Sequence, residues 1–211
     1  PECHESLAGI IAGRLRERYH KPSFVLTRGE EGVKGSGRSI EAYSMYEKLC
    51  ECKEYLTKFG GHPMAAGLSL EEENVETFRR KLNESSGLSQ DDLVEKVSID
   101  VPMPIHYIRK DLVRELSLLE PFGKGNEKPL FAQKNLWISQ LRVFGKNRNV
   151  VKMRLTDENG YPMDGVYFGD GDAFVEEARG KQKIAIVYYP DINVYQGRES
   201  LQVIIRHYQF D

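Results

Sequence analysis

The chain has 211 residues, of which 40% are hydrophobic, and its formal net charge is −2. This length allows one or two domains with buried cores, and the near-neutral charge excludes a uniformly basic nucleic-acid-binding protein. No apolar run reaches the roughly 18 residues of a membrane span and no signal-peptide pattern opens the chain, so we expect no membrane partner.

The first predicted domain, residues 1–88, alternates helices and strands. Ser6 is a predicted helix cap, and the apolar residues that follow it at helical spacing are expected to be buried: Leu7, Ile10, Ile11 and Leu15. A buried strand is expected at 24–27 and a turn at 28–32. The capping box Ser44-x-x-Glu47 predicts a second helix, with Leu49, Leu56 and Phe59 facing inward. A strand at 65–70 and a helix at 74–82 complete an α/β domain.

The segment 35–39, Gly-Ser-Gly-Arg-Ser, has the residue types of a phosphate site. The backbone N–H groups at Gly37, the hydroxyls of Ser36 and Ser39, and the guanidinium of Arg38 are expected to surround phosphate oxygens. It is not a Walker loop, because the spacing and the lysine are absent. An ordinary glycine turn with a surface arginine is the alternative.

A second small-residue segment, 60–67, is expected to follow the second helix directly. Gly60 and Gly61 permit a close backbone approach, and His62 is a candidate hydrogen-bond donor to a phosphate. The alternative is a helix C-cap followed by a tight strand.

The rest of the chain is predicted to hold a connecting segment, 89–128, and a barrel, 129–211. The connecting segment contains an expected strand at 97–101 and an expected helix at 107–119. Beyond it, hydrophobicity alternates with a period of two over five segments: 136–144, 150–157, 161–168, 184–189 and 201–208. A short helix is expected at 170–179, and three strands, a helix and two strands are typical of an OB-fold.

One face of this barrel is predicted to be cationic. Between Ala132 and Thr156 there are six Lys or Arg and no Asp or Glu. Single-strand binders combine such a surface with aromatic stacking platforms, so we expect DNA to contact Arg142, Lys146, Arg148, Lys152 and Arg154. Five aromatic residues are either stacking platforms or barrel core: Trp137, Phe144, Tyr161, Tyr167 and Phe168. A solvated face that binds nothing is the alternative.

The sequence contains no complete catalytic constellation, since it has no clustered carboxylates and no nucleophile beside a base. Three cysteines without a C-x-x-C pair favour reduced thiols in a cytoplasmic protein and predict no metal site. We therefore expect this chain to be inactive alone.

Four ordered segments resemble the C-terminal half of the bacterial RecJ family, the single-stranded-DNA-specific exonucleases of the DHH phosphoesterase superfamily. They are Cys-His-Glu-Ser-Leu-Ala-Gly-Ile-Ile-Ala at 3–12, Gly-Ser-Gly-Arg-Ser at 35–39, Phe-Gly-Gly-His-Pro-Met-Ala-Ala-Gly at 59–67 and Glu-Pro-Phe-Gly-Lys-Gly-Asn-Glu-Lys-Pro-Leu-Phe at 120–131. The resemblance covers nearly the whole chain and implies a DHH-associated domain followed by an OB-fold.

The resemblance further implies a 5′ to 3′ exonuclease of DNA recombination and repair. Its Mn²⁺ or Mg²⁺ is held by a DHH domain that is absent from this sequence. By motif position, Ser36, Arg38 and His62 are expected to hold the DNA backbone and 5′ end, with His4 in the same cleft. Two alternatives stay open: an OB module that docks single-strand binding protein or a helicase, and a fragment of a small-nucleotide phosphodiesterase.

Overall fold

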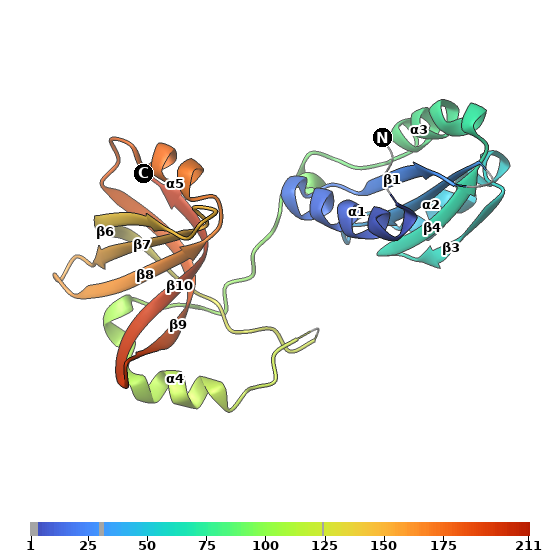
Figure 1. Ribbon diagram of the computed structural model, residues 1–211. Helices are drawn as coiled ribbons and strands as arrows, with labels where there is room; N and C mark the ends of the chain where they lie inside the picture. Colours follow the sequence, from blue (N-terminus) through green and yellow to red (C-terminus); the bar gives the residue numbers. More distant parts are fainter. Residues whose placement is uncertain (1–3, 30–31, 124) are drawn as a thin grey trace. The chain divides into compact units, whose positions relative to one another are not determined.

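The computed structural model describes residues 4–29, 32–123 and 125–211. The chain divides into two compact units, Pro1–Lys96 and Val97–Asp211. Figure 1 shows a sheet with helices in the first unit and a strongly curved sheet in the second. Within the described residues, no helix is both long and apolar enough to span a membrane.

The first unit is built on a four-stranded antiparallel sheet in the order β1-β2-β4-β3. The strands are β1 (Ser23–Arg28), β2 (Val33–Arg38), β3 (Lys58–His62) and β4 (Ala65–Leu70). The helices are α1 (Glu5–Tyr19), α2 (Met45–Glu51) and α3 (Val75–Glu84), with 3-10 turns η1 (Lys53–Tyr55), η2 (Glu72–Asn74) and η3 (Asp91–Leu93). The predicted α/β class of this domain is confirmed.

Alternation along the strands gives this sheet two different faces. Apolar side chains of β2 and β4, such as Val33 and Leu68, pack with Met45 of α2 and Phe78 of α3 in one core. The opposite face carries small and polar residues, and α1 covers only its β1 and β2 side. The β4 and β3 side of that face is thereby left for a cleft.

Two local predictions for this unit are wrong. The second helix ends at Glu51, and the segment expected as its continuation forms η1 and the edge strand β3, so the Gly-Gly-His motif lies on a strand. The segment 35–38 likewise belongs to the central strand β2 and not to a loop. Pairing of β2 with β1 and β4 uses both of its backbone edges, which overrides the low strand propensity of glycine.

Helix α1 also differs from its prediction. His4, not Ser6, is its N-cap, and the ring of His4 accepts from the backbone N–H of Ser6. The residues that α1 buries are Ala8 and Ala12, whereas the expected inward residues are partly or well exposed: Leu7, Ile10, Ile11 and Leu15. Small side chains face the sheet because α1 lies very close to β2, where a Cβ on Gly9 would come 2.9 Å from the Arg38 guanidinium.

The second unit is a closed ring of five strands. They are β6 (Phe131–Phe144), β7 (Val150–Thr156), β8 (Pro162–Phe168), β9 (Lys183–Tyr195) and β10 (Arg198–Phe210). The order β6-β7-β8-β10-β9 is closed by pairing of β6 with β9, and only β8 and β10 run parallel within the ring. Helix α5 (Gly171–Ala178) lies between β8 and β9 in sequence, so the predicted OB-fold order is confirmed.

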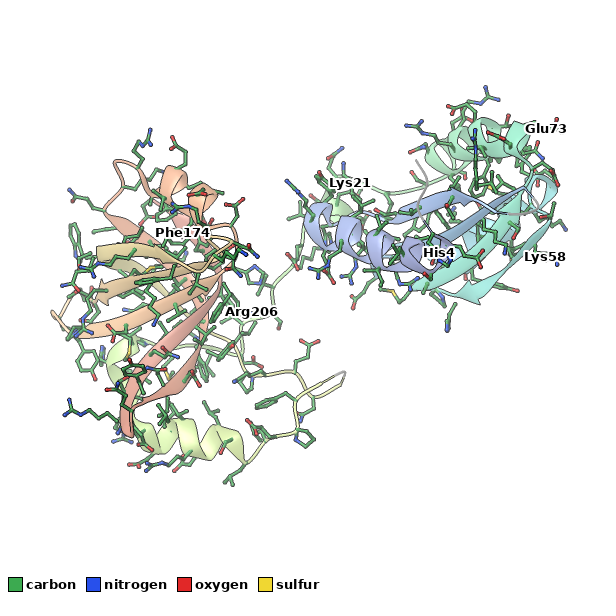
Figure 2. The ribbon with its side chains drawn as sticks, in the orientation of Figure 1. His4, Lys21, Lys58, Glu73, Phe174 and Arg206 are labelled. Atoms are coloured by element: carbon green, nitrogen blue, oxygen red, sulfur yellow. The ribbon has the colours of Figure 1, made fainter. Side chains whose placement is uncertain are left out.

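The barrel core is apolar and is closed at one end by aromatic rings. Phe174 of α5 is fully buried, and its ring contacts the rings of Tyr167, Tyr208 and Phe210. Figure 2 labels Phe174 at this end of the barrel. Outside the ring lie β5 (Val101–Pro102), η4 (Ile105–Tyr107) and α4 (Lys110–Ser117), all shorter than the strand and helix expected there.

Candidate nucleic-acid interface

The first unit contains a cleft whose floor includes two glycines. Ser36 of β2 lies opposite Gly67 of β4, and Gly67 lies opposite Gly60 of β3. A Cβ added at Gly60 would meet nothing within 4 Å, and one at Gly67 would meet only the Gly35 carbonyl oxygen, at 3.9 Å. All three residues of this row line a cavity of about 530 Å³, which we call the glycine cleft. Neither glycine is needed for packing, so the open floor is free to contact a ligand.

The rim of the glycine cleft is polar. The N-terminus of α1 supplies His4, Glu5 and Ser6, and the His4 ring lies 2.8 Å from the Ser6 hydroxyl. Lys34 forms an ion pair of 2.7 Å with Glu5, and this hydrogen bond and the lysine charge lower the pKa of the Glu5 carboxyl. Lys58 of β3 lines the cleft as well, and Figure 2 labels His4 and Lys58. The rim therefore carries two lysines against one carboxylate.

Arg38 lies beside the cleft and holds one of its residues. Its guanidinium donates to the Ser36 hydroxyl at 3.2 Å and to the Gly37 carbonyl at 2.8 Å. A serine hydroxyl has two lone pairs that accept hydrogen bonds and one O–H that donates. The Ser36 hydroxyl can therefore accept from Arg38 and still donate to a ligand. Arg38 therefore orients Ser36 and adds positive charge next to the floor.

Three of the residues expected around a phosphate have other surroundings. A Cβ on Gly37 would press into Phe24 and Met45, so Gly37 is required by the core. Ser39 is buried and donates to the Tyr43 carbonyl. Gly61 has a φ of 150°, and a Cβ there would clash with the Ala65 carbonyl. None of these three positions lines the glycine cleft.

His62 lies at the end of β3 and is exposed. It is paired with Ala65, which in turn is paired with Arg38, so His62 and Arg38 lie in one row across the sheet. This row is next to the row of Ser36, Gly67 and Gly60 on the same face.

The sequence did not single out several residues of the cleft. They are Thr27, Lys34, Lys58 and Ser69. In the sequence, these residues share one recognisable feature, which is that they alternate with apolar residues along strands. Only the pairing register of the four strands brings them together in one cleft.

The outer face of the barrel carries a second polar surface. Arg142 of β6 lies opposite Lys152 of β7, and the Lys152 ammonium lies 5.8 Å from the centre of the Phe144 ring. Along β7, Val151, Met153 and Leu155 are buried while Lys152 is exposed. A groove of about 260 Å³ runs over this face, lined by residues of all five strands: Gln140, Arg142, Phe144, Lys152, Met153, Arg154, Asp164, Gly165, Val166, Asn193, Ser200 and Gln202.

Two of the five predicted barrel cations form ion pairs. Arg148 bonds Asp172 of α5 through two guanidinium nitrogens, at 2.6–2.9 Å. Arg154 donates to Asp164 of the neighbouring strand β8. Lys146 lies with Arg148 in the loop between β6 and β7, and it is exposed. These partners come from beyond Thr156, outside the acid-free stretch of sequence.

The barrel aromatics divide between the core and the surface. Tyr167 packs in the core, whereas Trp137, Phe144 and Phe168 are 44%, 45% and 60% exposed. Tyr161 is also exposed, at 37%. Exposed rings beside cations are the elements of a single-strand binding surface.

Neither surface has the groups of a metal-dependent active site. Among the described residues, no three His, Cys, Asp or Glu side chains gather closely enough to hold a metal ion. The residues present therefore do not fit the Mn²⁺ or Mg²⁺ that the resemblance implies for the whole enzyme.

Two family models match the chain. The model described as the DHHA1 domain matches residues 1–86, and the model described as the RecJ OB domain matches residues 99–207. The two matched ranges fall one in each structural unit.

Curated relatives and solved structures agree with these matches. The chain is 35% identical over 204 residues to the single-stranded-DNA-specific exonuclease RecJ of Bacillus subtilis, covering 95% of this chain and 26% of that protein. Against RecJ of Escherichia coli it is 32% identical, covering 97% of this chain and 36% of the relative. The crystal structure of RecJ in complex with Mg²⁺ from Thermus thermophilus superposes with a TM-score of 0.81 at 26% identity, over 99% of this chain and 31% of that one. The chain thus spans about a quarter to a third of the length of these relatives.

Proposed function

The chain belongs to the RecJ family, and on that premise we propose that it is the DNA-binding C-terminal part of a single-stranded-DNA-specific 5′ to 3′ exonuclease. In the whole protein, hydrolysis belongs to a metal-dependent DHH domain outside this chain. The exonuclease acts in DNA recombination and repair in the cytoplasm, and the present chain positions its substrate.

The glycine cleft binds the sugar-phosphate backbone at the 5′ end. The observation that carries this proposal is the floor of Gly60 and Gly67, where a backbone can approach the sheet because no side chain stands between them. Ser36 donates its hydroxyl to a phosphate oxygen, and Arg38 keeps that hydroxyl in place. Lys58 at the rim adds a charge-assisted contact.

Two histidines of the first unit act on the same phosphate. His4 caps α1 and lies where the helix N-terminus favours an anion, and His62 is exposed at the end of β3. Gly37 and Gly61 contribute through the backbone geometry of the strands that they occupy. Ser39 follows β2, and its buried hydroxyl fixes the Tyr43 carbonyl.

The barrel binds single-stranded DNA as well. OB-folds bind oligonucleotides on the second and third strands and on the loops beside them, which here are β7, β8 and the loops at 145–149 and 196–197. Arg142, Lys146 and Lys152 neutralise phosphates, and Arg148 and Arg154 do so when a phosphate competes with their carboxylate partners. Phe144 and Phe168 provide exposed rings for stacking.

Fluorescence anisotropy with a 5′-phosphorylated single-stranded oligonucleotide tests this proposal. Arg38→Ala should weaken binding by about 1.5 to 3 kcal/mol, because a hydrogen-bonded charge is lost from the cleft. Arg79→Ala is the matched control: Arg79 is an exposed arginine of α3, which packs on the other face of the sheet. Equal affinities of Arg38→Ala and the parent would remove Arg38 from the site.

The alternatives give different titrations. If the barrel docks single-strand binding protein or a helicase, its affinity for DNA should be low and should not change with salt concentration. A small-nucleotide phosphodiesterase fragment predicts that a mononucleotide binds as tightly as the oligonucleotide.

A further inference from the structure

A row of polar side chains crosses the outer face of the barrel beside the cationic residues. Arg154 of β7 lies opposite Asp164 of β8, Asp164 opposite Gln202 of β10, and Gln202 opposite Asp191 of β9. Arg154 donates to Asp164, and the Gln202 amide donates to Asp191 at 2.7 Å. Four adjacent strands thus carry one arginine, two carboxylates and an amide in one line. We call Asp164, Gln202 and Asp191 the acceptor row.

The acceptor row and the cations share one groove. Arg142 and Lys152 form the neighbouring row, and that row continues onto Val166, which is buried. The groove is lined by these residues together with Asp164 and Gln202. Its two sides therefore differ: Arg142 and Lys152 attract phosphates on one side, whereas on the other the Asp164 carboxylate offsets the charge of Arg154.

This division orients a single strand within the groove. The phosphates follow Arg142 and Lys152, and the base turns toward the acceptor row, since a base carries no charge to be repelled. The groove has a volume of about 260 Å³, which is large enough to admit one pyrimidine ring. Phe144, 45% exposed and next to Lys152, offers a ring against which the base can stack.

The acceptor row also distinguishes between bases. A carboxylate accepts from the N4 amino group of cytosine, whereas thymine carries the O4 acceptor at the same place. The Asp164 carboxylate accepts from Arg154 through one oxygen and retains further lone pairs.

We propose that this groove binds a nucleobase and prefers cytosine to thymine, with Asp164 as the residue that sets the preference. The inference rests on the proposed function, namely that the barrel binds single-stranded DNA.

The test compares oligo-dC and oligo-dT of about twelve nucleotides, a length within the range that one OB-fold binds. The 211-residue chain is titrated with each by fluorescence anisotropy at slightly alkaline pH, where cytosine is unprotonated. We expect oligo-dC to bind about fivefold more tightly, which corresponds to one net hydrogen bond.

Asp164→Asn separates selectivity from charge. It removes a carboxylate that repels phosphates and releases Arg154, so affinity for oligo-dT should rise while the dC-to-dT ratio falls toward one. Asp172→Asn is the matched control, because it releases Arg148 in the same way at a place that does not line the groove. It should raise affinity for both oligonucleotides and leave their ratio unchanged.

The possible results are distinguishable. Equal binding of oligo-dC and oligo-dT by the parent, or an unchanged ratio in Asp164→Asn, overturns the inference and leaves the proposed function standing. A chain that binds neither oligonucleotide contradicts the proposed function, and the inference falls with it. Thermal unfolding is the control for folding. We expect both variants to unfold like the parent, because the substituted side chains are exposed.

Discussion

Gly67→Ala separates the binding role of the glycine cleft from its folding role. Gly67 lies in β4 outside the left-handed region, and a Cβ there would meet only the Gly35 carbonyl oxygen, at 3.9 Å. Alanine should therefore be accommodated and should raise stability by about 0.4 to 1 kcal/mol, because it reduces the entropy of the unfolded chain. The added methyl group stands next to Ser36 on the cleft floor.

The same methyl group should weaken DNA binding. The methyl group keeps the DNA backbone away from the Ser36 hydroxyl, so the hydrogen bond from this hydroxyl to a charged phosphate is lost. The binding free energy should weaken by about 1.5 to 3 kcal/mol, which is roughly a tenfold to hundredfold rise in Kd. The assay pairs thermal unfolding with anisotropy titration on a 5′-phosphorylated oligonucleotide.

Gly13→Ala in α1 is the control for this experiment. A Cβ at Gly13 meets nothing within 4 Å, and Gly13 does not line the cleft. It should raise stability by a similar amount and leave binding unchanged. Gly67→Ala that is stable and binds DNA like the parent would refute the assignment of the cleft.

Two further predictions concern stability. Gly37→Ala should lower the free energy of unfolding by about 1 to 3 kcal/mol, because its methyl group presses into Phe24 and Met45. Calorimetry should show a lower Tm, and an unchanged Tm would contradict the packing described. Burial alone would raise the pKa of the Asp157 carboxyl, but hydrogen bonds from the Tyr161 and Asn159 amides and from His106 outweigh it and lower that pKa. The Asp157 carboxylate therefore stabilises the fold at neutral pH, and this contribution is lost as the pH falls through the lowered pKa. In urea unfolding, Asp157→Asn should be less stable than the parent at pH 7 by about 1 to 3 kcal/mol, and the difference should shrink below about pH 3.9; a constant difference would argue against the carboxylate.

The barrel could be predicted because the buried and exposed positions of its strands alternate visibly in the sequence. Along β7, Val151, Met153 and Leu155 are buried and alternate with polar residues, so the period of two is visible in one segment. The helix at 171–178 between strands then fixes the order typical of an OB-fold.

The first unit was harder because its packing depends on contacts that are distant in sequence. The apolar spacing of Leu7 and Ile10 indicated a buried face, yet α1 approaches the sheet through Ala8 and Ala12. The strand β3 contains two glycines and no β-branched residue, so only its pairing with β4 makes it a strand.

The residues that share a binding surface could not be predicted either, because they too are distant in sequence. Gly60 was recognisable as a glycine but not as a neighbour of Gly67 and Ser36, because that row depends on strand register. The pairing of Arg154 with Asp164 depends on the register between β7 and β8. Residue types therefore predict the chemistry, whereas the sheet determines which residues share a site.

The central claim, that this chain binds single-stranded DNA, is tested most directly by titrating it with single-stranded and duplex oligonucleotides over a range of salt concentrations. We predict tighter binding of the single strand, with log K falling by about 0.7 per log unit of salt for each phosphate neutralised. Binding that is independent of salt, or tighter for the duplex, would contradict the account.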